Sequence, residues 1–230
     1  MIRQVEHHPT FVMLCSGNEF GFTTSGWSKL PAITAGLNEA TDPVRVSATA
    51  ARTTMDADEY WVTHRTTRGT RGPGPARTDW DFSQAALASD KPVISHETGQ
   101  RPSWPDYDRL LPKFTGVMQP WNLKRLRTRA AEAGCTNHAR RAQAAARFAM
   151  VQYKSEHEGM RRSKALVGYQ LLMLHDFTGQ GEAHVGLLDP FLAPKPGITL
   201  DEIRVWNGPT VPLARFPSYT WTTDQSLTAG

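Results

Sequence analysis

Two glutamates follow short apolar runs of the sequence and could form a catalytic pair. Glu19 comes after Phe11–Cys15, Glu97 comes after Pro92–Ser95, and a glycine follows each within two residues. The carboxyl ends of parallel strands meet at one edge of a sheet, so two such carboxylates can face one crevice. Glycoside hydrolysis needs such a set: one group protonates the leaving oxygen, and the other attacks the sugar or activates water. A lone glutamate of this kind is usually a solvated strand end. The pair, with Asn18 directly before Glu19, is rarer.

Short apolar runs alternate with helix-like segments along the chain. The runs, bounded by turn residues and partly β-branched or aromatic, are Phe11–Cys15, Val44–Ala48, Tyr60–Thr63, Pro92–Ser95 and Leu166–Leu174. The helix-like segments are Lys29–Glu39, Phe82–Ala88, Tyr107–Phe114, Asn137–Arg162, with Asn137 as N-cap, and Leu200–Trp206. This alternation predicts an α/β fold with parallel strands. Between Pro209 and Gly230, runs rich in threonine, valine and aromatic residues predict two further strands.

The composition bounds the class of protein. With 230 residues, 39% hydrophobic and 21% charged, the chain has enough apolar material for a core. No run approaches the ~18 apolar residues of a membrane span, and the first nine residues contain no apolar signal segment, so we expect no membrane partner. Two isolated cysteines, Cys15 and Cys135, make neither a disulfide framework nor a zinc cluster.

The positive charge is concentrated in one helical stretch. Trp121–Lys164 holds eleven Lys or Arg against three Glu, a balance of +8, so the other residues sum to −4 of the total of +4. Charge on such a stretch usually marks a solvated helix face. There is no zinc-finger or recognition-helix signature, so we expect no nucleic-acid partner. A basic module that binds polyanions through this stretch stays open as an alternative.

Five motifs together resemble glycoside hydrolase family 2 and its clan A relatives. His8–Glu19 looks like the fourth barrel strand of the family with its Asn-Glu pair, and Lys91–Glu97 looks like the seventh. Asp58–Thr63 resembles the sixth strand, Gly168–Phe177 the eighth, and Pro209–Arg215 the entry into a following β-sandwich. The matches follow the order of the family over nearly the whole chain.

The resemblance implies a retaining β-glycosidase of the β-galactosidase or β-glucuronidase type, acting on a carbohydrate substrate without cofactor or obligatory metal. Glu97 would be the nucleophile and Glu19 the general acid/base, while Asn18 would bind the 2-hydroxyl of the sugar. Residues 1–197 would form strands 4–8 of a (β/α)8 TIM barrel, and residues 198–230 would begin a truncated β-sandwich. We therefore expect a fragment of a larger enzyme, with self-association through an exposed barrel edge.

Further polar and aromatic residues could contact the substrate. His64, His175 and Asp176 follow predicted strands and could bind hydroxyls or serve as structural hydrogen-bond partners. Trp104 could stack on a sugar ring or pack against the barrel rim. Tyr169 and Gln170 are expected in the core. The eighth-strand motif lacks the tryptophan that many relatives carry there, which leaves the sugar undefined.

A non-catalytic carbohydrate-binding barrel is the alternative function, because the motifs of the first three barrel strands are not in the sequence. His157 and Glu158 are adjacent and point to different helix faces, and no second histidine lies four positions away, so no metal site is expected. Many relatives in the family are exported, which the resemblance alone suggests for this chain.

Overall fold

The computed structural model describes residues 2–18, 28–41, 44–47, 55–63, 78–87, 89–180 and 184–227. The chain divides into two compact units that are each built from separate stretches. The first unit comprises residues 1–96, 159–170 and 215–230, and the second comprises residues 97–158 and 171–214. The units interleave along the sequence, so each depends on contacts between residues far apart in the chain.

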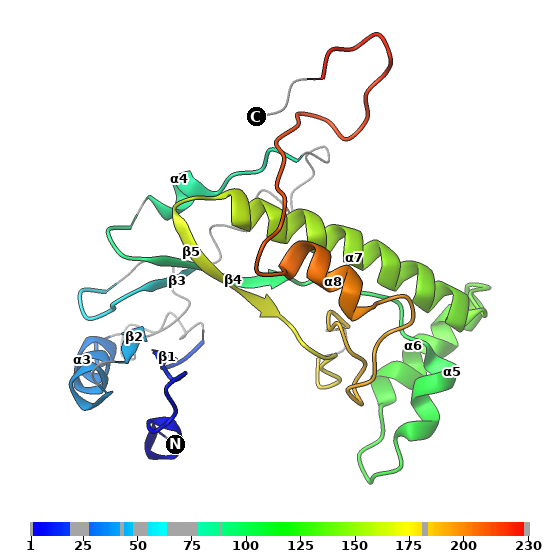
Figure 1. Ribbon diagram of the computed structural model, residues 1–230. Helices are drawn as coiled ribbons and strands as arrows, with labels where there is room; N and C mark the ends of the chain where they lie inside the picture. The colour runs from blue at the N-terminus through cyan, green and yellow to red at the C-terminus, as the bar shows by residue number, and fades with distance from the viewer. Residues whose placement is uncertain are drawn as a thin grey trace. The chain divides into compact units, whose positions relative to one another are not determined.

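The five predicted strands are all present, and the fold is mixed α/β (Figure 1). Their bounds are β1 Met13–Cys15, β2 Arg45–Ser47, β3 Trp61–Thr63, β4 Val93–Gly99 and β5 Leu166–Leu172. They form a two-stranded sheet, β1-β2, and a three-stranded sheet, β3-β4-β5. Both pairs whose register is defined, β1 with β2 and β3 with β4, are parallel, as expected. The described strands do not close into a barrel.

A backbone contact connects the two sheets in the first unit. The Glu59 N–H, just before β3, donates to the carbonyl of Val46 in β2 at 2.9 Å. The Glu59 carboxylate accepts the Val46 N–H at 2.8 Å and also binds Arg45. Along this part of the chain, consecutive strands are therefore neighbours, in the order in which they occur in the sequence.

The five predicted helical segments are present, α6 lies in the basic stretch expected to be helical, and α1 was not predicted. Their bounds are α1 Ile2–Val5, α3 Leu30–Thr41, α4 Ser83–Ala86, α5 Tyr107–Leu110, the 3-10 turn η2 Leu111–Lys113, α6 Trp121–Glu132, α7 His138–Arg162 and α8 Leu200–Asn207. The basic stretch thus divides into two helices, α6 and α7. Asn137 caps α7 as predicted, since its Oδ1 accepts the Arg140 N–H at 3.1 Å. Among the described residues, no helix combines the length and apolarity needed to cross a membrane.

The core of the second unit forms where α8 packs beside α7 (Figure 1). Buried residues of α7 recur every three or four positions, which places Ala146, Ala149, Met150 and Tyr153 on one face. This face packs against Leu187, Ile198 and Trp206, and the rings of Tyr153 and Trp206 stack with centroids 6.4 Å apart. A capping box between Thr199 and Glu202 begins α8 and so places Trp206 in this core.

The predicted strands near the end of the chain are absent: residues 209–227 contain no strand. Pro209, Pro212 and Pro217 interrupt the run, and each removes a backbone N–H that a sheet would need. A long-range backbone bond there joins the Thr78 N–H to the Phe216 carbonyl at 3.3 Å. Strand propensity alone predicted a sheet that these prolines interrupt.

A substitution of Gly99, at the end of β4, would test the packing of the second unit. The φ of Gly99 is +103°, and a Cβ at this position would overlap the Tyr153 ring and lie 3.2 Å from Leu171. We expect Gly99→Ala to lower the free energy of unfolding by about 3 kcal/mol, because the added methyl meets a buried ring in a backbone region that L-residues avoid. Urea unfolding measures the loss. Gly116→Ala, where a Cβ meets no atom within 4 Å, is the control, and an equal loss in both variants would contradict this packing.

Candidate functional site

Side chains from β4, from β5 and from the segment after β1 meet at His96 in the first unit. The Nε2 of His96, in β4, lies 2.8 Å from the Asn18 Oδ1, and its Nδ1 lies 2.8 Å from the Gln170 Oε1 in β5. Asn18 follows β1 and directly precedes Glu19, and His96 directly precedes Glu97. The structure therefore brings together the neighbours of both predicted catalytic glutamates. Gln170, expected in the core, is exposed and takes part in this contact.

Glu97 sits in an unusual stretch of backbone at the end of β4. Its φ is +48°, that of Gln100 is +35° and that of Gly99 is +103°. Left-handed conformations of non-glycine residues cost energy and gather at functional sites. The side chain of Glu97 is half-buried, and the Gln100 Nε2 donates to its Oε2 at 2.8 Å. The turn thus aims the carboxylate, and Gln100 holds it.

Three contacts with α7 fix the residues that follow Glu97. Gly99 packs on Tyr153, and Arg101 forms an ion pair with the fully buried Glu156 at 2.9 Å. Thr98, also fully buried, faces the Nε2 of His157 at 3.5 Å. The His157 Nδ1 lies 2.7 Å from the Tyr153 carbonyl, which can only accept, so Nδ1 donates and Nε2 is left as an acceptor for the Thr98 hydroxyl. Burial lowers the pKa of His157 to about 4.

Two of the predicted site residues, Glu19 and His64, lie outside the described residues. The arrangement of Glu19 relative to Glu97 therefore stays a prediction. For His64, the choice between a substrate contact and a structural role stays open as well.

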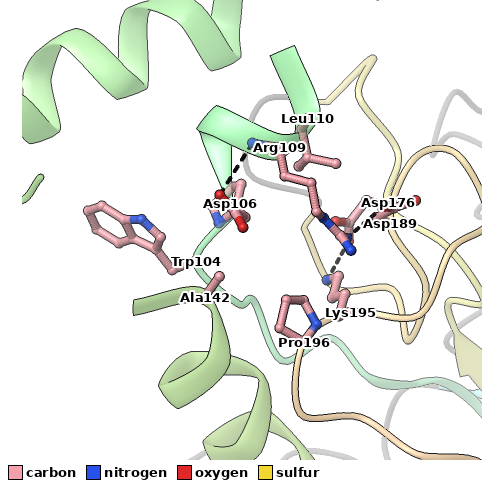
Figure 2. A pocket seen from close by; sticks show the side chains of 10 residues that line it. Trp104, Asp106, Arg109, Leu110, Ala142, Asp176, Asp189, Lys195 and Pro196 are labelled. Carbon is pink, nitrogen blue, oxygen red and sulfur yellow. Dashed lines mark hydrogen bonds and ion pairs between the residues drawn. The ribbon is translucent and has the colours of Figure 1, made fainter. Parts of the chain in front are cut away.

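Trp104 lines a narrow pocket of the second unit (Figure 2). Its Nε1 donates to the His138 Nδ1 at 3.4 Å, and the Arg141 guanidinium lies 5.6 Å from its ring centroid. The ring is half-buried. Opposite Trp104 in Figure 2, charged side chains gather; they include Arg109, Asp176, Asp189 and Lys195. Packing accounts for these contacts of Trp104, and its role as a sugar platform stays a prediction.

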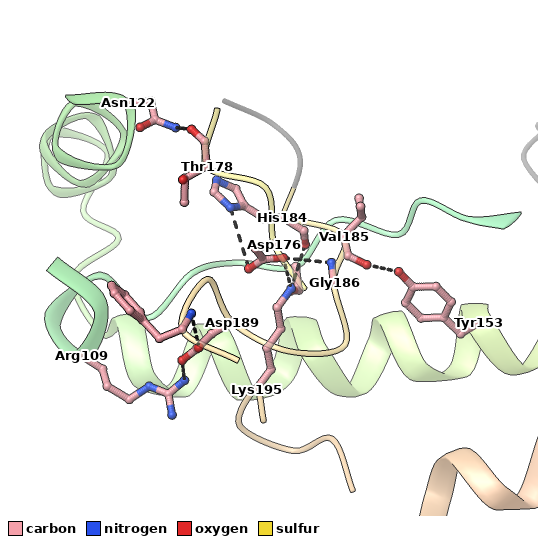
Figure 3. Close-up of polar contacts among 12 residues, drawn as sticks. Arg109, Asn122, Tyr153, Asp176, Thr178, His184, Val185, Gly186, Asp189 and Lys195 are labelled. Carbon is pink, nitrogen blue, oxygen red and sulfur yellow. Dashed lines mark hydrogen bonds and ion pairs between the residues drawn. The ribbon is translucent and has the colours of Figure 1, made fainter. Parts of the chain in front are cut away.

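His175 and Asp176 are adjacent but have opposite environments. His175 is exposed, whereas Asp176 is buried and pairs with the buried Lys195 at 2.7 Å (Figure 3). The Gly186 N–H donates to Asp176 at 2.9 Å. Burial raises the pKa of Asp176 and lowers that of Lys195, while each partner opposes the shift of the other. The Asp176 carboxylate is therefore committed to an internal ion pair, and substrate contact by either residue stays a prediction.

Lys195 joins this ion pair to two other parts of the second unit. Its Nζ donates to the Ser103 Oγ at 2.8 Å and to the His184 carbonyl at 2.9 Å. Nearby, Asp189 pairs with Arg109 at 2.8 Å (Figure 3). Sequence reasoning missed Lys195, because a lysine between two prolines is a usual loop residue. It also missed His96 and Gln100, although their positions beside Glu97 could have drawn attention to them.

The described residues contain no group of three or more histidine, cysteine, aspartate or glutamate side chains that could hold a metal ion. In comparisons with known proteins, neither a family model nor a curated protein matches the sequence. The motifs and the geometry around Glu97 and His96 are therefore the observations that bear on function.

The low pKa of His157 gives a testable pH dependence. Unfolded His157 binds a proton below about pH 6.5, but the folded protein does so only below about pH 4. The contribution of His157 to the free energy of unfolding is therefore lost as the pH falls from about 6.5 to 4, and this loss amounts to up to about 3 kcal/mol. We expect His157→Asn, which keeps a donor for the Tyr153 carbonyl, to flatten the pH dependence of the free energy of unfolding in this window. An unchanged slope in His157→Asn would contradict the assignment.

The buried ion pair gives a second prediction. Lys195→Met leaves the Asp176 carboxylate buried without its cation, so we expect the free energy of unfolding to fall by about 3–5 kcal/mol. Adding Asp176→Asn should recover part of this loss, because the uncompensated charge is removed. Arg204→Met, which breaks the exposed pair with Asp201, should cost less than about 1 kcal/mol. Equal losses at the two sites in urea unfolding would argue against a buried pair.

Proposed function

We propose that the protein is a retaining β-glycosidase in which Glu97 is the nucleophile and Glu19 the general acid/base. The observation that carries the proposal is the 2.8 Å contact between Asn18 and His96. These residues directly precede the two glutamates, although 78 positions separate Glu19 from Glu97. The contact therefore joins the residue before Glu97 to the residue before the proposed acid/base. Paired carboxylates at one site are the requirement of glycoside hydrolysis.

The fold supports a partial (β/α)8 barrel as the setting of this site. Within each sheet, neighbouring strands follow the order of the chain, β1-β2 and β3-β4-β5. Glu59, just before β3, connects the two sheets through its hydrogen bond to Val46 of β2. The defined pairs are parallel. In such barrels, catalytic residues stand at the carboxyl ends of the strands. Asn18 follows β1, which ends at Cys15, and Glu97 is near the carboxyl end of β4.

The reaction proceeds by two displacements at the anomeric carbon. Glu97 attacks this carbon while Glu19 protonates the departing oxygen, so the glycosidic bond breaks and a glycosyl ester of Glu97 forms. Glu19 then removes a proton from water, which displaces Glu97 and restores the original configuration. This mechanism requires the carboxyl groups to lie roughly 5–5.5 Å apart. Gln100 donates to the Glu97 Oε2 at 2.8 Å and so holds the attacking carboxylate in place.

Activity measurements on paired variants test the proposal. We expect Glu97→Gln and Glu19→Gln each to lower the release of nitrophenol from an aryl β-glycoside by at least about 100-fold, because each removes one of the two reacting carboxyl groups. Glu39→Gln makes the same change on the exposed face of α3 and should keep full activity. A panel of aryl glycosides identifies the sugar.

Azide distinguishes the two roles. With azide, Glu97→Ala should yield the α-glycosyl azide, because azide replaces the nucleophile on its own face. Glu19→Ala should yield the β-glycosyl azide, because azide attacks the glycosyl-enzyme. Full activity in either glutamate variant would overturn the proposal, as would an inverted product from the unmodified protein. Binding of sugar without any hydrolysis would instead indicate a carbohydrate-binding protein.

A further inference from the structure

We propose that His96 is a positioning residue that holds the Asn18 amide in the orientation needed to bind the sugar. This inference rests on the proposed function for its consequence in catalysis. The contact itself is independent of that function: Nε2 of His96 lies 2.8 Å from the Asn18 Oδ1, and Nδ1 lies 2.8 Å from the Gln170 Oε1. A single ring therefore joins the side chain of Asn18, which follows β1, to that of Gln170 in β5.

The orientation of the Asn18 amide follows from the chemistry of its two ends. An amide oxygen only accepts hydrogen bonds and an amide NH2 only donates them. In the tautomer whose Nε2 carries the hydrogen, Nε2 donates to the Asn18 Oδ1, so the NH2 of Asn18 points away from the ring and is presented as a donor. A sugar hydroxyl oxygen can accept from it. Without a partner on Oδ1, the amide rotates freely and loses this preference.

Two substitutions of His96 can test the contacts of its two ring nitrogens one at a time. Glutamine places an amide group near the position of Nε2, whereas asparagine places one near Nδ1. His96→Gln therefore keeps a partner for Asn18, and His96→Asn keeps a partner for Gln170 alone. Both variants are polar and similar in size, so they form a matched pair. A role in general stability would affect them alike, but a role in positioning Asn18 separates them.

We expect His96→Asn to lower kcat/KM for a 2-hydroxy aryl glycoside about tenfold, through kcat more than KM, because the contact to the 2-hydroxyl strengthens in the transition state. His96→Gln should remain within about twofold of the unmodified protein. On the matching 2-deoxy glycoside, both variants should equal the unmodified protein. Adding Asn18→Ala to His96→Asn should cause no further loss, because both changes remove the same contact.

The side-chain nitrogen signals of His96 in NMR spectra provide a readout that needs no activity. Asn18→Ala should shift the Nε2 resonance of His96 and leave Nδ1 nearly unchanged, and Gln170→Ala should do the reverse. If the protein hydrolyses no glycoside but these shifts occur, the proposed function fails and the positioning contact stands. An unmoved Nε2 resonance in Asn18→Ala, or equal losses of kcat/KM in His96→Gln and His96→Asn, would overturn the inference.

Discussion

The burial of Tyr153 is the interaction on which the second unit depends. Its ring stacks with Trp206 of α8, and Gly99 at the end of β4 packs against it. Its hydroxyl donates to the Val185 carbonyl, and its own carbonyl accepts from His157. One side chain of α7 thus contacts a strand end, a loop and a second helix. A ring enclosed on so many sides leaves no room for a Cβ at residue 99, which explains why a glycine stands there.

The left-handed turn after Glu97 follows from the same packing. Gly99 is pressed on Tyr153 and Thr98 is buried beside His157, and β4 ends at this point in a distorted backbone. The cost of positive φ at Glu97 and Gln100 is offset by burial of the residues between and after them. As a result, the Glu97 carboxylate leaves the strand in a fixed direction and meets the Gln100 amide. Core packing in this unit therefore sets the direction of the proposed nucleophile.

The sequence predicted those features that local pattern determines. Short apolar runs gave all five strands, and a three-to-four-residue period with Asn137 as cap gave α7. Features that depend on distant partners were not predictable. Nothing local to Lys195 indicates that it is buried, because its carboxylate partner Asp176 is 19 positions earlier. Gln170 was expected in the core. It is exposed instead and contacts His96, which is 74 positions away in the sequence. The prediction of strands after Pro209 was wrong, because strand propensity takes no account of the backbone N–H groups that proline lacks.

The candidate site shows the same division between local and distant information. Glu19 and Glu97 were proposed from their residue type and from their positions after predicted strands, both of which can be read in the sequence. The relation between the ends of those strands comes from His96, whose two ring nitrogens reach Asn18 and Gln170. Histidine suits position 96 because its rigid ring carries two polar atoms on opposite sides, which reach the amides of Asn18 and Gln170. An asparagine or a glutamine at position 96 could reach only one of the two. A residue next to a catalytic glutamate can therefore matter through the strand it connects rather than through the substrate it touches.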